Sequence, residues 1–224
     1  MSKLMGILKK GTIAPQLLES FVSHQGNDTQ PGRWGVAGYL GNWTVRYGAG
    51  DKPVAEEKQQ YEAACGHALL AGAKILIAHL HHGYTESSPL IKNNWLFCNS
   101  GVLIETENPV HGEPCGSAQA FFSTLVEKLD QRSTKAYPSL IYDLVEYWRS
   151  HCQMQFFSFV VSDGRHLIAY RDSRDHEGLA ALFCSVSEDA FLVCSQKLPG
   201  GEWKEIKKGE VVVVDRHEVI HGLQ

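Results

Sequence analysis

Two nearly continuous apolar segments near the middle of the chain limit how it can fold. Lys74–His81 begins with Ile, Leu, Ile and Ala after its lysine, and Asn94–Leu103 contains Trp, Leu, Phe and Cys in succession. A strand with apolar residues at successive positions, rather than at alternate ones, is typically covered on both faces. The chain therefore needs a sheet with other elements packed against each of its sides.

Four segments with helical periodicity can supply this cover. In the first of them, Pro15 suits a first helical turn, and apolar residues recur at Leu17, Leu18, Phe21 and Val22. The other three carry a similar apolar stripe along one side. The predicted helices cover residues 14–26, 54–71, 118–130 and 137–151.

Short strands bounded by turn residues account for most of the remaining chain. Gly41-Asn42 and Asp163-Gly164 predict two hairpin turns. The order of elements predicts an α/β (α+β) fold: a four-layer αββα sandwich of two stacked, mainly antiparallel sheets, in a single domain over residues 1–224. The predicted strands are 35–40, 43–47, 74–81, 94–103, 156–161, 167–170, 181–186, 190–194 and 211–215.

The charge balance and the cysteine spacing argue against several classes of protein. With 21 Lys+Arg against 25 Asp+Glu, the formal net charge is -4, which disfavours binding to a nucleic-acid backbone. No stretch approaches the roughly 18 apolar residues of a membrane span, and the start lacks the apolar centre of a signal peptide. We expect a cytoplasmic protein with no nucleic-acid or membrane partner, whose six scattered cysteines are reduced and packed.

Three small features are candidates for chemistry, and each is also common in purely structural roles. His79 and His81 are two residues apart, so a strand would place both on one face, as a metal site requires. Ser2 follows the initiator methionine and would combine nucleophile and base if its amine were free. Asn99-Ser100-Gly101 follows an apolar strand, where the Gly101 amide could face a developing oxyanion.

Eight segments of the sequence resemble the stand-alone class II glutamine amidotransferases, which have the N-terminal-nucleophile hydrolase fold. Their order and spacing agree with that family over nearly the whole chain. The resemblance implies the same αββα sandwich that the hydrophobic pattern predicts. The segments are 1–6, 32–39, 46–53, 77–81, 97–103, 117–122, 159–164 and 203–214.

The resemblance also assigns roles to single positions, and four of these positions carry substitutions. Ser2 stands where relatives have the nucleophilic cysteine, and His81 stands where they have the arginine that grips the substrate carboxylate. Ser100 replaces the asparagine of the oxyanion hole, while Gly101 keeps the backbone donor. Ser117 replaces the aspartate that holds the substrate amino group.

These substitutions favour a pseudoenzyme: a glutamine amidotransferase-like domain without glutaminase activity that binds a small amide or amino-acid-like ligand, or a protein partner. The predicted ligand-binding residues are Trp34, Gly35, His79, His81 and Ser117.

Two alternatives remain open from the sequence. One is an active amidohydrolase that uses Ser2 as an N-terminal nucleophile on a different amide, such as a γ-glutamyl compound. The other is a metal-dependent activity at His79, His81 and His82, with His111 as a further ligand. The pseudoenzyme and the amidohydrolase hypotheses include no metal site, and none of the three hypotheses includes a cofactor.

Overall fold

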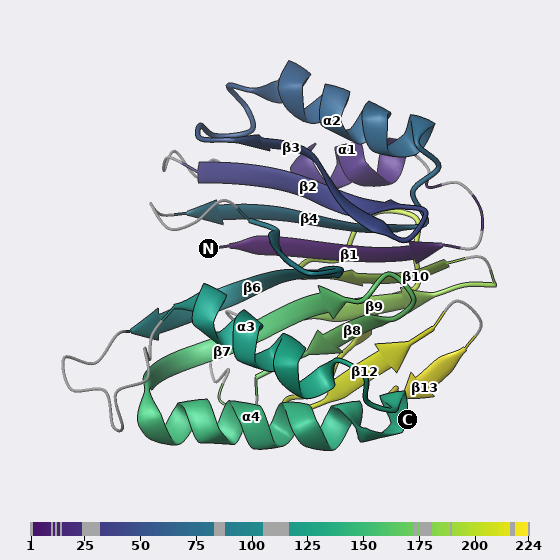
Figure 1. Ribbon diagram of the computed structural model, residues 1–224. Helices are drawn as coiled ribbons and strands as arrows, with labels where there is room; N and C mark the ends of the chain where they lie inside the picture. The colour runs from purple at the N-terminus through teal and green to yellow at the C-terminus, as the bar shows by residue number, and fades with distance from the viewer. Residues whose placement is uncertain are drawn as a thin grey trace.

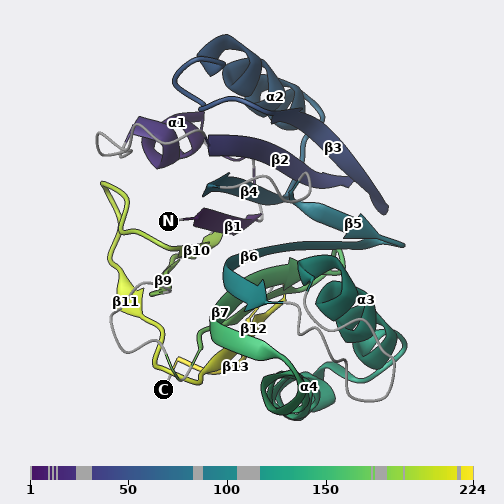
Figure 2. The same ribbon diagram turned by 90° about the vertical axis from the view of Figure 1, so that its left-hand side faces the viewer.

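The chain folds as two β-sheets stacked face to face, with helices on both outer sides (Figures 1 and 2). The computed structural model describes residues 2–9, 11, 13, 15–23, 32–82, 88–104, 117–172, 174, 181–188, 190–215 and 218–223. Within them, the helices α1 (Pro15–Ser23) and α2 (Lys58–Leu70) lie over one sheet, and α3 (Ala118–Leu129) and α4 (Tyr137–His151) cover the other. This layering confirms the predicted αββα sandwich.

The first sheet has seven strands in the order β11-β9-β10-β1-β4-β2-β3, and each neighbouring pair is antiparallel. The strand β1 lies inside this sheet, where Leu4 is opposite His79 of β4 and Met5 is opposite Cys194 of β10. The strands are β1 (Lys3–Lys9), β2 (Gly32–Leu40), β3 (Trp43–Gly50), β4 (Ile75–His82), β9 (Phe183–Val186), β10 (Ala190–Cys194) and β11 (Lys204–Glu205).

The second sheet has six strands in the order β13-β12-β8-β7-β6-β5, again with antiparallel neighbours. The pairing of its strands β6 and β7 has a register shift between Gly101 and Leu103. The strands are β5 (Leu90–Lys92), β6 (Trp95–Ile104), β7 (Gln153–Ser162), β8 (Leu167–Tyr170), β12 (Val211–Val214) and β13 (Val219–His221).

The two apolar segments of the sequence are explained by these layers. On β4, Ile75 and Ile77 belong to the core between the sheets, whereas Leu76 and Ala78 belong to the core beneath α1 and α2. On β6, Cys98 faces the other sheet, and Phe97 packs into the core under α3 and α4. Both strands are covered on two faces, as the sequence predicts.

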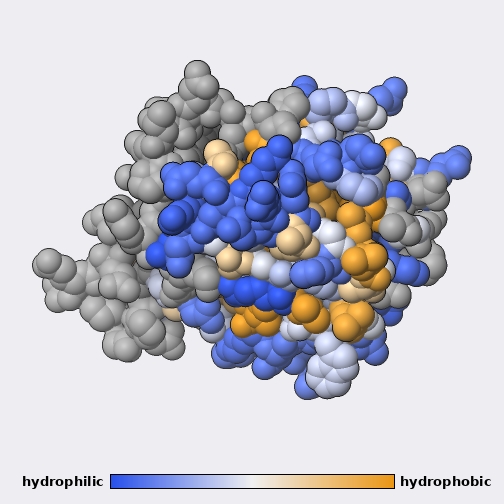
Figure 3. Space-filling model, turned by 90° about the horizontal axis from the view of Figure 1, so that it is seen from above, coloured by the Kyte–Doolittle hydropathy of each residue, from blue (hydrophilic) through white to orange (hydrophobic). Residues whose placement is uncertain are grey.

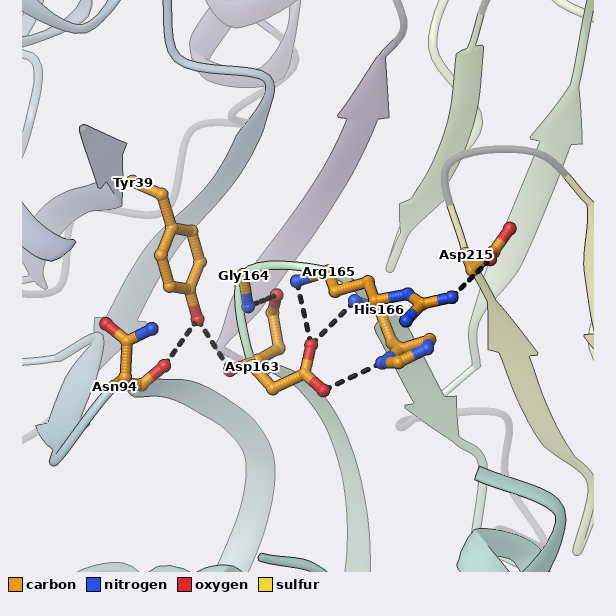
Figure 4. Close-up of polar contacts among 8 residues, drawn as sticks. Tyr39, Asn94, Asp163, Gly164, Arg165, His166 and Asp215 are labelled. Atoms are coloured by element: carbon orange, nitrogen blue, oxygen red, sulfur yellow. Dashed lines mark hydrogen bonds and ion pairs between the residues drawn. The ribbon is translucent and has the colours of Figure 1, made fainter. Parts of the chain in front are cut away.

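At one end of the sandwich, Tyr39 of β2 joins the two sheets (Figure 4). Its buried hydroxyl donates to the carbonyl oxygen of Ser162 at 2.7 Å and lies 3.1 Å from that of Asn94. In the adjoining β7–β8 turn, the Asp163 carboxylate accepts from the backbone of His166 at 2.6 Å and lies 2.7 Å from its Nδ1. Burial acts to raise the pKa of Asp163, but the hydrogen bonds from His166 outweigh it and hold the pKa below its usual value.

The strand β1 is absent from the sequence-based prediction. Its apolar residues are interrupted by Gly6, which lowers the strand propensity of a short segment. The glycine has a packing reason, because a Cβ at Gly6 would lie 2.7 Å from Cγ1 of Val160 on the opposite sheet. The short strands β5, β11 and β13 also lack a sequence prediction, and α2 begins at Lys58 rather than at residue 54.

The cysteine prediction is wrong at one position. Cys65, Cys98, Cys184 and Cys194 are free and buried, as expected of packed thiols. Cys152, which follows α4, is instead disulfide-bonded.

The outer face over α2 is mainly hydrophilic, and apolar residues gather toward one side of this view (Figure 3). Exposed apolar side chains include Trp43 at the β2–β3 turn and Leu70 at the end of α2, which are 79% and 87% exposed. In the part of the chain that the structure describes, no helix is long and apolar enough to cross a membrane.

Candidate functional site

The layer between the sheets is apolar over most of its length and becomes polar at the end opposite Tyr39. Because Ile75 and Ile77 of β4 face this layer, the alternation of the strand directs His79 and His81 to the same face. Ser100 of β6 follows Cys98 with the same alternation and is also buried. The chain enters β1 and leaves β4 and β6 at this end (Figure 1).

Ser2 and Ser100 meet at this polar end, although 98 residues separate them in sequence. The Ser100 hydroxyl donates to the Ser2 carbonyl oxygen over 3.4 Å. Extending the β1–β4 register by one residue places Ser2 beside His81 on the face between the sheets. The structure therefore brings three sequence-predicted residues together from three strands or strand ends.

Gly101 has a conformation that only glycine adopts readily. Its φ angle is +126°, and a Cβ would lie 1.9 Å from the backbone oxygen of Phe156. The Asn99 side chain donates to the Gly101 carbonyl at 3.5 Å. The backbone of β6 therefore requires a glycine at position 101, next to the register shift. Ser100 immediately precedes this glycine in the strand.

His79 and His81 form a stacked pair. Their ring centroids are 5.0 Å apart with an interplanar angle of 24°, and the residues are only 4% and 6% exposed. Burial is the main cause that lowers the pKa of His79 to about 3; His81 acts in the same direction, and the Asn99 backbone opposes it. His79 is therefore a neutral imidazole at physiological pH, with Nδ1 2.6 Å from the Ser88 hydroxyl oxygen.

Ser88 is a site residue that sequence reasoning missed. It sits over Gly35 of β2, which lies directly opposite His79, and a Cβ at Gly35 would come within 1.8 Å of the Ser88 backbone oxygen. Arg46 of β3 donates to the carbonyl of the next residue, Pro89, at 2.8 Å. The sequence carries no signal for Ser88, because the pairing of Gly35 with His79 is known only from the sheet.

Trp34 and Ser117 have structural partners. The Trp34 side chain lies in the core beneath α1 and α2, on the opposite face of β2 from Gly35. Its Nε1 donates to Glu57 at 2.8 Å, and its ring packs edge-on against Tyr61 at 5.5 Å. The Ser117 hydroxyl accepts from the Ala120 amide at 3.0 Å and caps α3. The structure does not bring Trp34 to the polar end of the intersheet layer.

Arg33 is a second residue that the sequence did not single out. It lies on β2 directly opposite His81, and strand alternation places it on the face that carries Gly35. Its Nε is 3.2 Å from an oxygen of Asp51, whose side chain is largely exposed. A positive charge therefore lies one strand away from His81.

The described residues bring together few metal-binding side chains. Among residues whose side chains the structure describes, no group of three or more His, Cys, Asp or Glu side chains could hold a metal ion. The side chain of His82 and all of His111 lie outside the described set. The described histidine pair gives the metal hypothesis only two ligands.

Comparisons with known proteins agree with this fold. A family model described as class-II glutamine amidotransferases matches residues 1–186. An uncharacterized protein of Methanocaldococcus jannaschii is 22% identical over 258 residues, covering 99% of this chain and 71% of its own length.

Two solved structures illustrate the likeness in three dimensions. A glutamine aminotransferase class-II domain protein from Silicibacter pomeroyi has a TM-score of 0.62 at 18% identity, covering 95% of this chain and 94% of its own. Glutamine phosphoribosylpyrophosphate amidotransferase from Bacillus subtilis has a TM-score of 0.59 at 16% identity and covers 95% of this chain. The match spans 47% of that enzyme, and at such identities it shows a shared fold only.

Proposed function

Because the chain belongs to the class-II glutamine amidotransferase family, we propose that it is a member without glutaminase activity that binds a small amide or amino-acid-like ligand at the polar end of the intersheet layer. The observation that carries this proposal is the buried, stacked pair of His79 and His81 beside Ser2 and Ser100, in which His79 is neutral. The family resemblance assigns site roles to Ser2, His81 and Ser100, and the side chains at these positions differ from those of the family.

The substitutions weaken the binding of free glutamine. His81 lacks the planar fork and permanent charge that arginine offers a carboxylate. Ser117 carries no charge for an amino group, and its hydroxyl is already engaged as a helix cap. A charge-assisted contact is worth about 1.5–3 kcal/mol, so losing two would reduce glutamine binding by roughly 10²- to 10⁴-fold if they are independent.

The first test is ammonia release from L-glutamine by the wild-type protein and by Ser2→Ala. We expect equal, background rates for both proteins. Glutamine hydrolysis by the wild type that disappears in Ser2→Ala would refute the proposal.

A second candidate function, an amidohydrolase that acts on a different amide, is favoured by one observation. Ser2 lies within hydrogen-bond distance of Ser100, and Gly101 offers a backbone amide at the position of an oxyanion donor. This chemistry requires a free Ser2 amine as base. Intact mass of the purified protein tests it, because retention of the initiator methionine blocks that amine.

The proposal also includes the cellular compartment and the binding partner. We expect it to act in the cytoplasm, with a small ligand or a protein partner. Fractionation of cells that express the native chain tests the compartment.

A further inference from the structure

We propose that the outer edge of β3, together with the side of α2 that lies over it, binds a second copy of this chain, so that the two β3 strands pair antiparallel about a two-fold axis. In Figure 2, β3 is the outermost strand of its sheet, and α2 lies over it. This surface is outside the polar end of the intersheet layer, so the proposal goes beyond the proposed function and does not depend on it.

The strand β3 has few of the features that protect an exposed sheet edge. Among the strands that the structure describes it pairs with β2 alone, and it is eight residues long. Natural edge strands are usually short, or they carry charges or proline that discourage further pairing. The one charged residue of β3, Arg46, donates to the Pro89 carbonyl oxygen at 2.8 Å. A further strand can therefore pair along this edge.

One extra residue in β3, Tyr47, changes which side chains share a face. It lies at the register shift between Val36 and Ala37 of β2 and has no direct partner there. Before the shift, Arg46 is opposite Ala37, which belongs to the core between the sheets. After the shift, Gly48 is opposite Val36, which belongs to the core beneath α2. Because opposite residues share a face and faces alternate along a strand, every position can be assigned. Trp43, Val45, Gly48 and Gly50 face α2, whereas Thr44, Arg46 and Ala49 face the other sheet.

The antiparallel register that pairs all eight residues of two β3 strands also matches these faces. It sets Trp43 with Gly50, Thr44 with Ala49, Val45 with Gly48, and Arg46 with Tyr47 at the two-fold axis. In both pairs on the face of α2, a large side chain is opposite a residue that has none. An aromatic residue across from a glycine is a favourable pair, because the ring covers exposed backbone. A shift of one residue would set opposite faces against each other.

The internal match favours a second copy over an unrelated strand. The large residues lie in the first half of β3 and the glycines in the second half, so each copy carries both parts of the match. A two-fold interface requires this kind of self-complementary surface. Trp43, which is 79% exposed in the single chain, would become covered at both ends of the paired strands.

The side of α2 over this edge is uncharged. Ala64 packs against a glycine of β3 and so marks the side of the helix that is turned toward the edge strand. Of the residues three or four positions from Ala64, Gln60 and His67 are exposed. Lys58 and Glu62 pair with each other at 3.6 Å along a different row of the helix. The α2 helix of a second copy would therefore meet no fixed like charge on this side.

The first test is sedimentation equilibrium of the full chain over a wide range of concentration. We expect a wild-type dimer. Ala49→Lys, which puts a charge at an exposed position of the edge, and Trp43→Ser should each raise its dissociation constant at least about tenfold. Val186→Lys is the matched control, because it changes an exposed apolar residue on β9, which has a strand on each side, and it should leave the dimer unchanged.

The second test is a disulfide cross-link that reports the register. Thr44 and Ala49 are about 16 Å apart along one strand, too far for a bond within a chain, but they meet between copies. On oxidation, the double variant Thr44→Cys/Ala49→Cys should give a covalent dimer on a non-reducing gel, and each single variant should give far less. These small changes keep the proposal testable even if Ala49→Lys or Trp43→Ser fails to fold.

Three results would overturn the proposal. One is a chain that stays monomeric at every concentration, including the case in which another protein binds this edge. Another is a dimer whose dissociation constant is the same in folded Ala49→Lys and Trp43→Ser as in the wild type. The third is equal cross-linking of the single and double cysteine variants, which would exclude the assigned register.

Discussion

His79 should make the stability of the fold depend on pH in a defined direction. A histidine has an ordinary pKa of 6.5, and burial lowers that of folded His79 to about 3. Between these values the unfolded chain binds a proton that the folded protein does not. The contribution of the neutral ring is therefore complete above pH 6.5 and is lost progressively as the pH falls toward 3.

The size of the effect follows from the same two values. One pH unit corresponds to about 1.4 kcal/mol for each proton taken up on unfolding, so at pH 5 the loss should be about 2 kcal/mol. Urea unfolding at pH 7.5, 6 and 5, followed by tryptophan fluorescence, measures it. His79→Gln removes the titrating group, and His67→Gln, which changes an exposed histidine on α2, is the matched control.

The comparison rests on the slope of stability with pH rather than on stability itself, because His79→Gln also disturbs a buried contact. We expect the wild type and His67→Gln to share a steep slope, and His79→Gln to be flatter by about 2 kcal/mol over the range. If His79→Gln retains the wild-type slope, His79 is not a buried neutral ring and the reasoning about its proton fails.

Three further substitutions test the packing of the fold. Gly35→Ala should cost about 1–3 kcal/mol in urea unfolding and displace Ser88 from its histidine, because the new Cβ would meet the Ser88 backbone oxygen at 1.8 Å; an unchanged histidine NMR signal would contradict this. Tyr39→Phe should lower the unfolding free energy by about 0.5–1.5 kcal/mol through the lost intersheet hydrogen bond, measured in the same way. Asp172→Ala should cost about 3–5 kcal/mol, because it removes the buried carboxylate that pairs with the Arg149 guanidinium and accepts from the Phe157 amide; a melting temperature within a degree of wild type would refute this.

Much of the fold follows from patterns that the sequence displays locally. The amphipathic helices and the two hairpin turns are local signals, and the apolar runs on β4 and β6 require cover on both faces. The strand β1 escapes such reasoning because its Gly6 is explained only by a contact with the other sheet. Packing against the other sheet explains the glycine at position 6, and the neighbouring residues in sequence carry no signal of that packing.

The candidate site divides in a similar way. Alternation on one strand predicts that His79 and His81 share a face, and the resemblance brings Ser2 and Ser100 into one site. Ser88 could not be predicted, because its role depends on chain passing over Gly35 from elsewhere. Trp34 shows a limit of the family resemblance, because a matching segment does not reveal on which face of β2 each side chain lies.

The central place of β1 in its sheet has a consequence for the time course of folding. Its partner β10 comes nearly 200 residues later, as the hydrogen bond between Leu4 and Ser195, 191 residues apart, shows. Contacts between such distant parts of a chain slow folding, because a long loop must close before the pairing repays it. On a ribosome, β1 is made long before β10, so one of its edges stays open until β10 has emerged. Nascent chains that end before β10 should therefore be the forms that chaperones hold or that aggregate.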